Sequence, residues 1–140
     1  MAELNRHQER QVAFQTLFSL AMNPDADVKV VVQQVLNGDP EIEWQGALPE
    51  QVLTLVAGVT EQVDQLDVKI SDHLAAGWTL DRLGLTDLVL LRLALYEAQL
   101  GQTPTNVVIN EALQLAHTFT DDQSRKFING VLNNILTAAE

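Results

Sequence analysis

The chain has 140 residues, of which 46% are hydrophobic, and it carries a formal net charge of −11 at pH 7. This length supports one domain with its own core, and the absence of cysteine excludes disulfides, thiolate metal sites and cysteine nucleophiles. The acidic balance opposes nonspecific adhesion to nucleic acid or anionic lipid, and because no run of about 18 apolar residues could span a membrane, we expect a soluble, untargeted, cytoplasmic protein.

Helical periodicity runs through the first half of the chain. Apolar residues at three- and four-residue steps predict a helix over residues 4–22, and Asp25 or Asp27 can cap a second helix over residues 28–36. Pro49 is suited to the first turn of a third helix. That helix is expected to continue as far as Ala76, with a bend near Gly58.

The second half of the chain is helical as well. Thr86 is the expected N-cap of a helix that is apolar on nearly all sides and ends at Gly101, so this helix should be the most buried. "Thr103-Pro104" opens the next helix, and residues 120–122 open the last one. No alternating strand pattern competes. The sequence therefore predicts an all-α fold of six or seven helices.

The sequence lacks the residue patterns of common catalytic and metal sites. Its three histidines form no helical metal-binding pair, so we expect no metal site. It contains no glycine-rich phosphate loop and no nucleophile elbow around a serine. These absences favour a binding protein without cofactors over an enzyme.

Two residues in the second half call for a structural explanation. Arg92 lies inside an apolar run, where an isolated cation would cost several kcal/mol, so we expect an ion pair with Glu97, Glu111 or Asp87. Gly130 lies inside the last helix, where glycine costs about 1 kcal/mol relative to alanine. Close packing of another helix against Gly130 would explain it.

Positive charge is scarce and unevenly placed. The chain has eight Lys and Arg against nineteen Asp and Glu, yet "NRHQERQVAF" gathers Arg6, His7 and Arg10 near the start of the first helix. Arg125 and Lys126 are the only adjacent basic pair. If the two helix starts are neighbours, these residues form one basic patch on an acidic surface. The alternative is that the N-terminal cations only neutralise Glu3 and Glu9.

Three sequence blocks in the second half resemble the NusB family of bacterial transcription antitermination factors. They are "LLRLALYEAQL", "TPTNVVINEALQLAHTF" and "SRKFINGVLNNIL", and "RQVAFQTLF" resembles the opening helix of the family. The resemblance implies two small helical bundles, here residues 1–77 and 78–140. It also implies a protein without catalytic activity that binds boxA RNA together with NusE, a ribosomal protein, and joins an elongating RNA polymerase complex.

The resemblance also assigns expected roles to individual residues. Arg6 and Arg10 match an arginine-rich stretch that binds RNA, whereas His7 and Gln8 stand where further arginines are typical. Asp87 matches a position used toward NusE. Arg92, Tyr96, Glu97 and Asn129 are expected to be internal scaffold residues. The expected RNA-binding residues are Arg6, His7, Arg10, Gln123, Ser124, Arg125 and Lys126.

Two other functions stay open at the level of sequence. The low arginine content fits an acidic helical adaptor or homodimer that binds a protein partner and little or no RNA. A related helical domain is attached to rRNA cytosine methyltransferases, but no catalytic domain is expected after residue 140. RNA affinity that weakens with salt would distinguish the antitermination factor from the adaptor.

Overall fold

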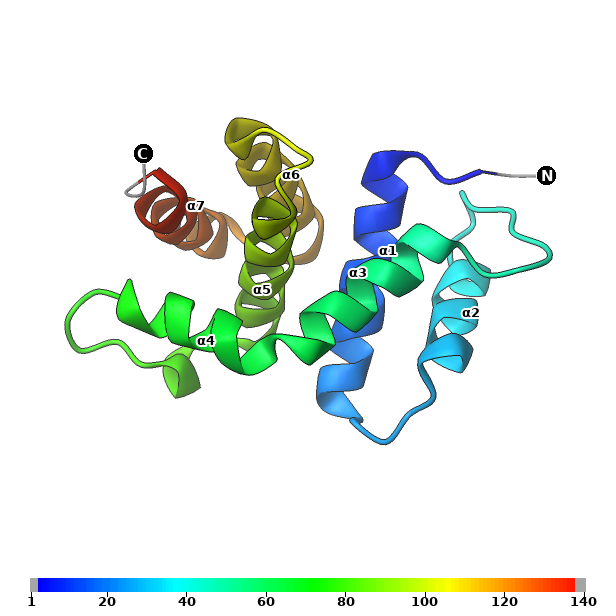
Figure 1. Cartoon of the computed structure of the whole chain (residues 1–140), viewed down its shortest axis with the longest axis horizontal. Coiled ribbons are helices and arrows are strands. Elements are labelled where there is room, and N and C mark those ends of the chain that lie inside the picture. Colours follow the sequence, from blue (N-terminus) through cyan, green and yellow to red (C-terminus); the bar gives the residue numbers. More distant parts are fainter. Residues whose placement is uncertain (1–2, 138–140) are drawn as a thin grey trace. The chain divides into compact units, whose positions relative to one another are not determined.

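The structure is a computed structural model that describes residues 3–137. These residues form seven α-helices and one short 3-10 helix, with no strand among them (Figure 1). The all-α prediction is therefore confirmed. Contacts group the helices into two compact units, one ending at Thr60 and one beginning at Glu61.

The first unit contains α1 (Arg6–Met22), α2 (Val28–Gly38) and most of α3 (Glu50–Glu61), and α1 packs against α2 (Figure 1). Asp27 caps α2, since its side chain accepts hydrogen bonds from the backbone N–H groups of Lys29 and Val30 at 2.9 and 3.3 Å. The second of the two expected caps is thus the one used. The middle of the apolar stripe of α1 is buried, and Val12 and Ala13 have no exposed surface.

Thr16 is the one polar residue of α1 that is completely buried. Its hydroxyl oxygen has no hydrogen-bond partner among the described residues. Because an unpaired buried hydroxyl costs about 1–3 kcal/mol, Thr16→Val is expected to raise the free energy of unfolding by about 1 kcal/mol. Chemical denaturation measures this change. Thr60→Val is the control, because the Thr60 hydroxyl donates to the Val56 carbonyl at 2.7 Å, and it should give no gain in stability. Equal gains in the two variants would show that the unpaired hydroxyl of Thr16 is not the cause.

The second unit contains α4 (Val63–Asp72), the 3-10 helix η1 (Leu80–Arg82), α5 (Leu85–Leu100), α6 (Thr105–Phe119) and α7 (Asp122–Thr137). Helix α5 packs against α4, α6 and α7 (Figure 1), and eight of its residues are buried. This confirms that the helix with apolar residues on nearly all sides is the central one. It ends at Gly101, whose φ of 68° is a left-handed conformation that glycine adopts without strain.

Three sequence-based details differ from the structure. The long helix predicted for residues 49–76 is two helices, and the chain breaks at Gln62, not near Gly58, which lies buried within α3. Helix α5 begins at Leu85 with Gly84 in the cap position, so Thr86 is not its N-cap. Contacts also assign α4 to the second unit, whereas the predicted boundary between residues 77 and 78 assigned it to the first.

Arg92 forms an ion pair that joins α5 to α4. Its Nε and Nη2 donate to the two carboxylate oxygens of Asp67, both at 2.8 Å. The side chains of Arg92 and Asp67 are only 16% and 20% exposed. An internal pair was expected, but none of the three proposed partners was correct. Periodicity could not identify Asp67, because it lies on another helix 25 residues earlier in the sequence.

Gly130 is exposed on α7, contrary to the expectation that another helix packs against it. A Cβ added to Gly130 would meet no atom within 4 Å. Asn129 is also exposed, and its carbonyl and side-chain oxygens accept hydrogen bonds from the Asn133 amide. The interpretation of Asn129 as an internal scaffold residue was therefore wrong.

The open surroundings of Gly130 predict that Gly130→Ala stabilises the protein. The expected gain is about 0.5–1 kcal/mol, because alanine restricts the unfolded chain and favours the helix. Thermal unfolding monitored by circular dichroism at 222 nm measures the gain. Gly101→Ala is the contrasting variant, since its positive φ should make alanine destabilising. A loss of stability in Gly130→Ala would contradict the prediction.

Candidate nucleic-acid interface

The N-terminal cations lie on the first turns of α1. Asn5 and Gln8 form a capping box: the Asn5 side chain accepts from the Gln8 N–H at 2.8 Å, and the Gln8 side chain accepts from the Asn5 N–H at 3.0 Å. Gln8 thus helps to cap the start of α1, at a position where the resemblance to the family makes a further arginine typical. Arg6 is exposed, His7 is partly buried, and Arg10 is only 5% exposed.

The electrostatics of this turn involve the neighbouring Glu9. Burial raises the pKa of Glu9 above its ordinary value, while the positive charges of Arg6 and Arg10 lower it. The positive charges of Arg6 and Arg10 are therefore partly offset by the carboxylate of Glu9. Of the three cationic candidates in this turn, Arg6 is the one with a well-exposed side chain.

The second group of candidates lies at the start of α7. Asp121 precedes this helix, and its carboxylate accepts from the Ser124 backbone N–H at 2.8 Å. Gln123 and Lys126 are exposed. Arg125 is 40% exposed and lies 3.3 Å from the carboxylate of Asp122, and it also donates to Nδ1 of His117 at 3.2 Å. The start of α7 thus presents the exposed ammonium group of Lys126 and the guanidinium group of Arg125, which Asp122 and His117 hold in one direction.

Asp87 and Ser124 were expected to serve different partners, and the structure brings them together. The Ser124 hydroxyl donates to a carboxylate oxygen of Asp87 at 3.2 Å, which links the start of α5 to the start of α7. Burial raises the pKa of Asp87 above its ordinary value. The Ser124 hydrogen bond lowers this pKa, and the negative charge of Asp121 raises it further.

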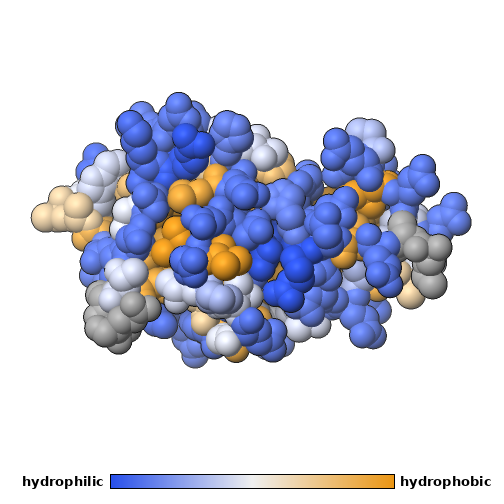
Figure 2. Space-filling model, turned by 90° about the horizontal axis from the view of Figure 1, so that it is seen from above, coloured by the Kyte–Doolittle hydropathy of each residue, from blue (hydrophilic) through white to orange (hydrophobic). Residues whose placement is uncertain are grey.

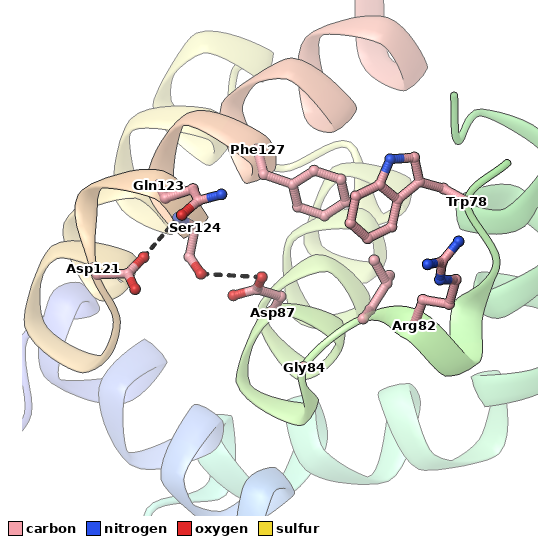
Figure 3. Close-up of a pocket in the computed structure, with 9 residues that line it drawn as sticks. Trp78, Arg82, Gly84, Asp87, Asp121, Gln123, Ser124 and Phe127 are labelled. Carbon is pink, nitrogen blue, oxygen red and sulfur yellow. Dashed lines mark hydrogen bonds between the residues drawn. The ribbon is translucent and has the colours of Figure 1, made fainter. Parts of the chain in front are cut away.

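A pocket lies beside this hydrogen bond (Figure 3). Two aromatic rings, those of Trp78 and Phe127, lie on one side of it, and the carboxylates of Asp87 and Asp121 lie on the other. Sequence reasoning missed the pocket. The available signal was Trp78 within "GWTLDR", a large aromatic residue outside any apolar stripe. The lining residues are Trp78, Arg82, Leu83, Gly84, Asp87, Asp121, Gln123, Ser124 and Phe127.

The two groups of cations belong to different units. Arg6, His7 and Arg10 lie in the unit that ends at Thr60, whereas Arg125 and Lys126 lie in the unit that begins at Glu61. The single shared basic patch therefore stays a prediction. Within the second unit, the structure does join the candidates Gln123 and Ser124 to Asp87 around one pocket.

The described residues offer neither a metal site nor a membrane-spanning helix. Across residues 3–137, no group of three or more His, Asp or Glu side chains is arranged to hold a metal ion. None of the helices in this range has the length and apolar character needed to cross a membrane. The face shown in Figure 2 is largely hydrophilic, with apolar side chains in small groups.

Comparisons with known proteins agree with this geometry. A sequence profile described as "NusB family" matches residues 7–137. The transcription antitermination protein NusB of Limosilactobacillus reuteri (strain DSM 20016) is 51% identical over 130 residues, which cover 92% of this chain and 91% of that protein. NusB of Lactiplantibacillus plantarum is 46% identical over 134 residues, which cover 95% of each chain.

Two solved structures are similar over nearly the whole chain. A structure of T. maritima NusB has a TM-score of 0.79 at 28% identity and covers 97% of this chain and 93% of its own. A crystal structure of the antitermination factors NusB and NusE in complex with dsRNA has a TM-score of 0.78 at 25% identity and covers 96% of this chain and 99% of its own. Together with the profile match and the two relatives, these similarities show that the chain belongs to the NusB family.

Proposed function

We propose that this protein is a transcription antitermination factor. It binds boxA-type nascent RNA together with NusE and joins the elongating RNA polymerase complex, without catalysing a reaction and within the cytoplasm. The observation that carries the proposal is the start of α7. There, exposed Gln123 and Lys126 flank Ser124 and Arg125, and Ser124 is bonded to Asp87, the residue expected to face NusE. The related NusB was crystallised with NusE and RNA.

The charge distribution supports a localised RNA surface. Backbone phosphates supply most of the salt-dependent affinity of a protein for nucleic acid, and the chain carries eleven more acidic than basic side chains. An RNA strand would be repelled over most of such a surface. The few exposed cations therefore decide where RNA can bind, while Asp87 faces the protein partner.

A fluorescence anisotropy titration tests the proposal. The protein is titrated into a labelled boxA RNA and into a scrambled RNA, with and without NusE, at two salt concentrations. We expect a preference for boxA that NusE strengthens and that salt weakens. No binding to either RNA, with or without NusE, would refute the proposal.

One observation favours a second function, an acidic adaptor or homodimer that binds protein and little RNA. Arg10 was expected to contact RNA, but it is buried, with only 5% of its surface exposed. In the same titration, this function predicts binding of NusE with no preference between the two RNAs. Sedimentation velocity of the protein alone distinguishes an adaptor from a homodimer.

A further inference from the structure

Helix α7 has one continuous exposed face. Its apolar residues, such as Val131 and Leu132, are buried where α7 packs against α4, α5 and α6. The exposed residues on the opposite side recur at three- and four-residue steps, so they form one stripe along the helix. We call this stripe the α7 outer face. It consists of Gln123, Lys126, Asn129, Gly130, Asn133 and Thr137.

Gly130 lies in the middle of the α7 outer face, and no contact within residues 3–137 explains it. A glycine inside a helix costs stability. The φ of Gly130 is not positive, so the backbone conformation does not require glycine, and no atom lies within 4 Å of an added Cβ. Glycine also allows a ligand to approach the backbone closely. A ligand that packs on α7 would therefore explain this residue.

The charge of the α7 outer face differs from that of the chain as a whole. The chain has nineteen Asp and Glu against eight Lys and Arg, yet α7 contains no acidic residue after Asp122. Its outer face carries the ammonium group of Lys126 near one end. At a rise of 1.5 Å per residue, the face extends for about 15 Å from Gln123 to Asn133. A phosphate strand could follow it over this length without meeting a carboxylate of α7.

Two amides provide hydrogen-bonding groups in the middle of this face. The Asn133 amide nitrogen donates to the carbonyl and side-chain oxygens of Asn129, at 2.8 and 2.7 Å. This pairing holds both side chains against the helix. Within residues 3–137, the amide nitrogen of Asn129 has no acceptor of its own. Asparagine amides are among the groups that bind phosphate and sugar oxygens of nucleic acids.

The composition of the α7 outer face favours RNA over a protein partner. The cores of protein interfaces are enriched in aromatic residues, methionine and arginine. None of the large hydrophobic side chains that are exposed within residues 3–137 belongs to α7. The face offers amides, a hydroxyl and an ammonium group instead. Such polar and positively charged surfaces are typical of nucleic-acid interfaces.

Resting on the proposed RNA binding, we propose that the sugar–phosphate backbone of the bound RNA runs along the α7 outer face, from Gln123 and Lys126 past Gly130 to Asn133. The strand lies close to the helix at Gly130, and the Asn129 amide donates to a phosphate or sugar oxygen. Contacts of this kind carry no sequence information. They raise the affinity for any RNA and leave the choice of boxA to other residues.

The first test adds a side chain at Gly130. Gly130→Gln should unfold at a higher temperature, because glutamine favours a helix. It should nevertheless bind boxA RNA at least about fivefold more weakly, which corresponds to the loss of one phosphate contact at 0.1 M salt. Gly38→Gln is the matched control, since Gly38 is an exposed glycine of α2 with equally open surroundings, and it should keep the RNA affinity. Anisotropy titrations with NusE at saturating concentration measure these affinities.

The second test adds a negative charge to the same face. Asn133→Asp should weaken boxA RNA and scrambled RNA by the same factor of about five, since the added carboxylate repels a phosphate of either strand. Asn37→Asp adds the same charge at an exposed position of α2. This control should change RNA affinity by less than about twofold, because salt screens a charge that lies off the path of the strand.

The outcomes distinguish failure of this inference from failure of the proposed function. If the unaltered protein binds boxA RNA and Gly130→Gln binds it equally well, the backbone path along α7 is wrong and the proposed function stands. Equal losses in Asn133→Asp and Asn37→Asp would likewise overturn the path. A loss of NusE affinity, measured without RNA, that is at least as large as the loss of RNA affinity would assign the face to the protein partner. Absence of RNA binding by the unaltered protein would overturn both.

Discussion

Arg92→Ala is expected to lower the free energy of unfolding by about 2–4 kcal/mol, slightly less than the 3–5 kcal/mol for breaking a fully buried ion pair. The variant leaves the Asp67 carboxylate mostly buried without the guanidinium that donates two hydrogen bonds to it at 2.8 Å. It also removes the packing of the long side chain between α4 and α5. Urea denaturation monitored by circular dichroism measures the loss.

A double variant separates the unpaired charge from the lost packing. Arg92→Met with Asp67→Leu replaces both charges by apolar side chains, and it should recover most of the loss, because a buried ion pair contributes little beyond a well-packed apolar pair. Lys69→Ala, an exposed residue of α4, is the matched control and should change stability by less than about 0.5 kcal/mol. If Arg92→Ala is as stable as this control, the ion pair does not stabilise the contact between α4 and α5.

Removing Arg6, Arg125 and Lys126 from the two candidate groups should produce the largest loss of RNA binding. Each phosphate contact to a single strand contributes a slope of about −0.7 in log affinity against log salt, which is a factor of about five at 0.1 M salt. The triple variant Arg6→Ala, Arg125→Ala and Lys126→Ala is therefore expected to bind boxA RNA about 100-fold more weakly at that salt. Its salt slope should be less steep by about 2. Anisotropy titrations at four salt concentrations measure both quantities.

The control for this variant removes positive charge elsewhere. Lys29 on α2 and Lys69 on α4 are exposed cations outside both candidate groups, and the double variant Lys29→Ala with Lys69→Ala should keep the salt slope within about 0.5 of the original. Similar losses in the two variants would mean that RNA responds to net charge and not to these positions. Binding of NusE should be the same in all of these proteins, since Asp87 is unchanged.

Local patterns in the sequence were sufficient to predict where most of the helices lie. Apolar residues at three- and four-residue steps predicted six or seven helices. This works because each helix buries one face, and residues on one face recur with the helical period of 3.6 residues. The cap at Asp27 and the end at Gly101 follow from the chemistry of single residues. The break at Gln62 was missed because the apolar spacing continues through it.

The sequence by itself thus determined the all-α class, most helix boundaries to within a few residues and, through its resemblance, the family. Only the tertiary structure decided which side chains meet: Arg92 with Asp67, 25 residues apart, and Ser124 with Asp87, 37 residues apart. It also decided that Trp78 lies beside Phe127 and that nothing packs on Gly130. The physical reason is that periodicity records which face of a helix is buried, whereas the partner of that face depends on how the helices pack together.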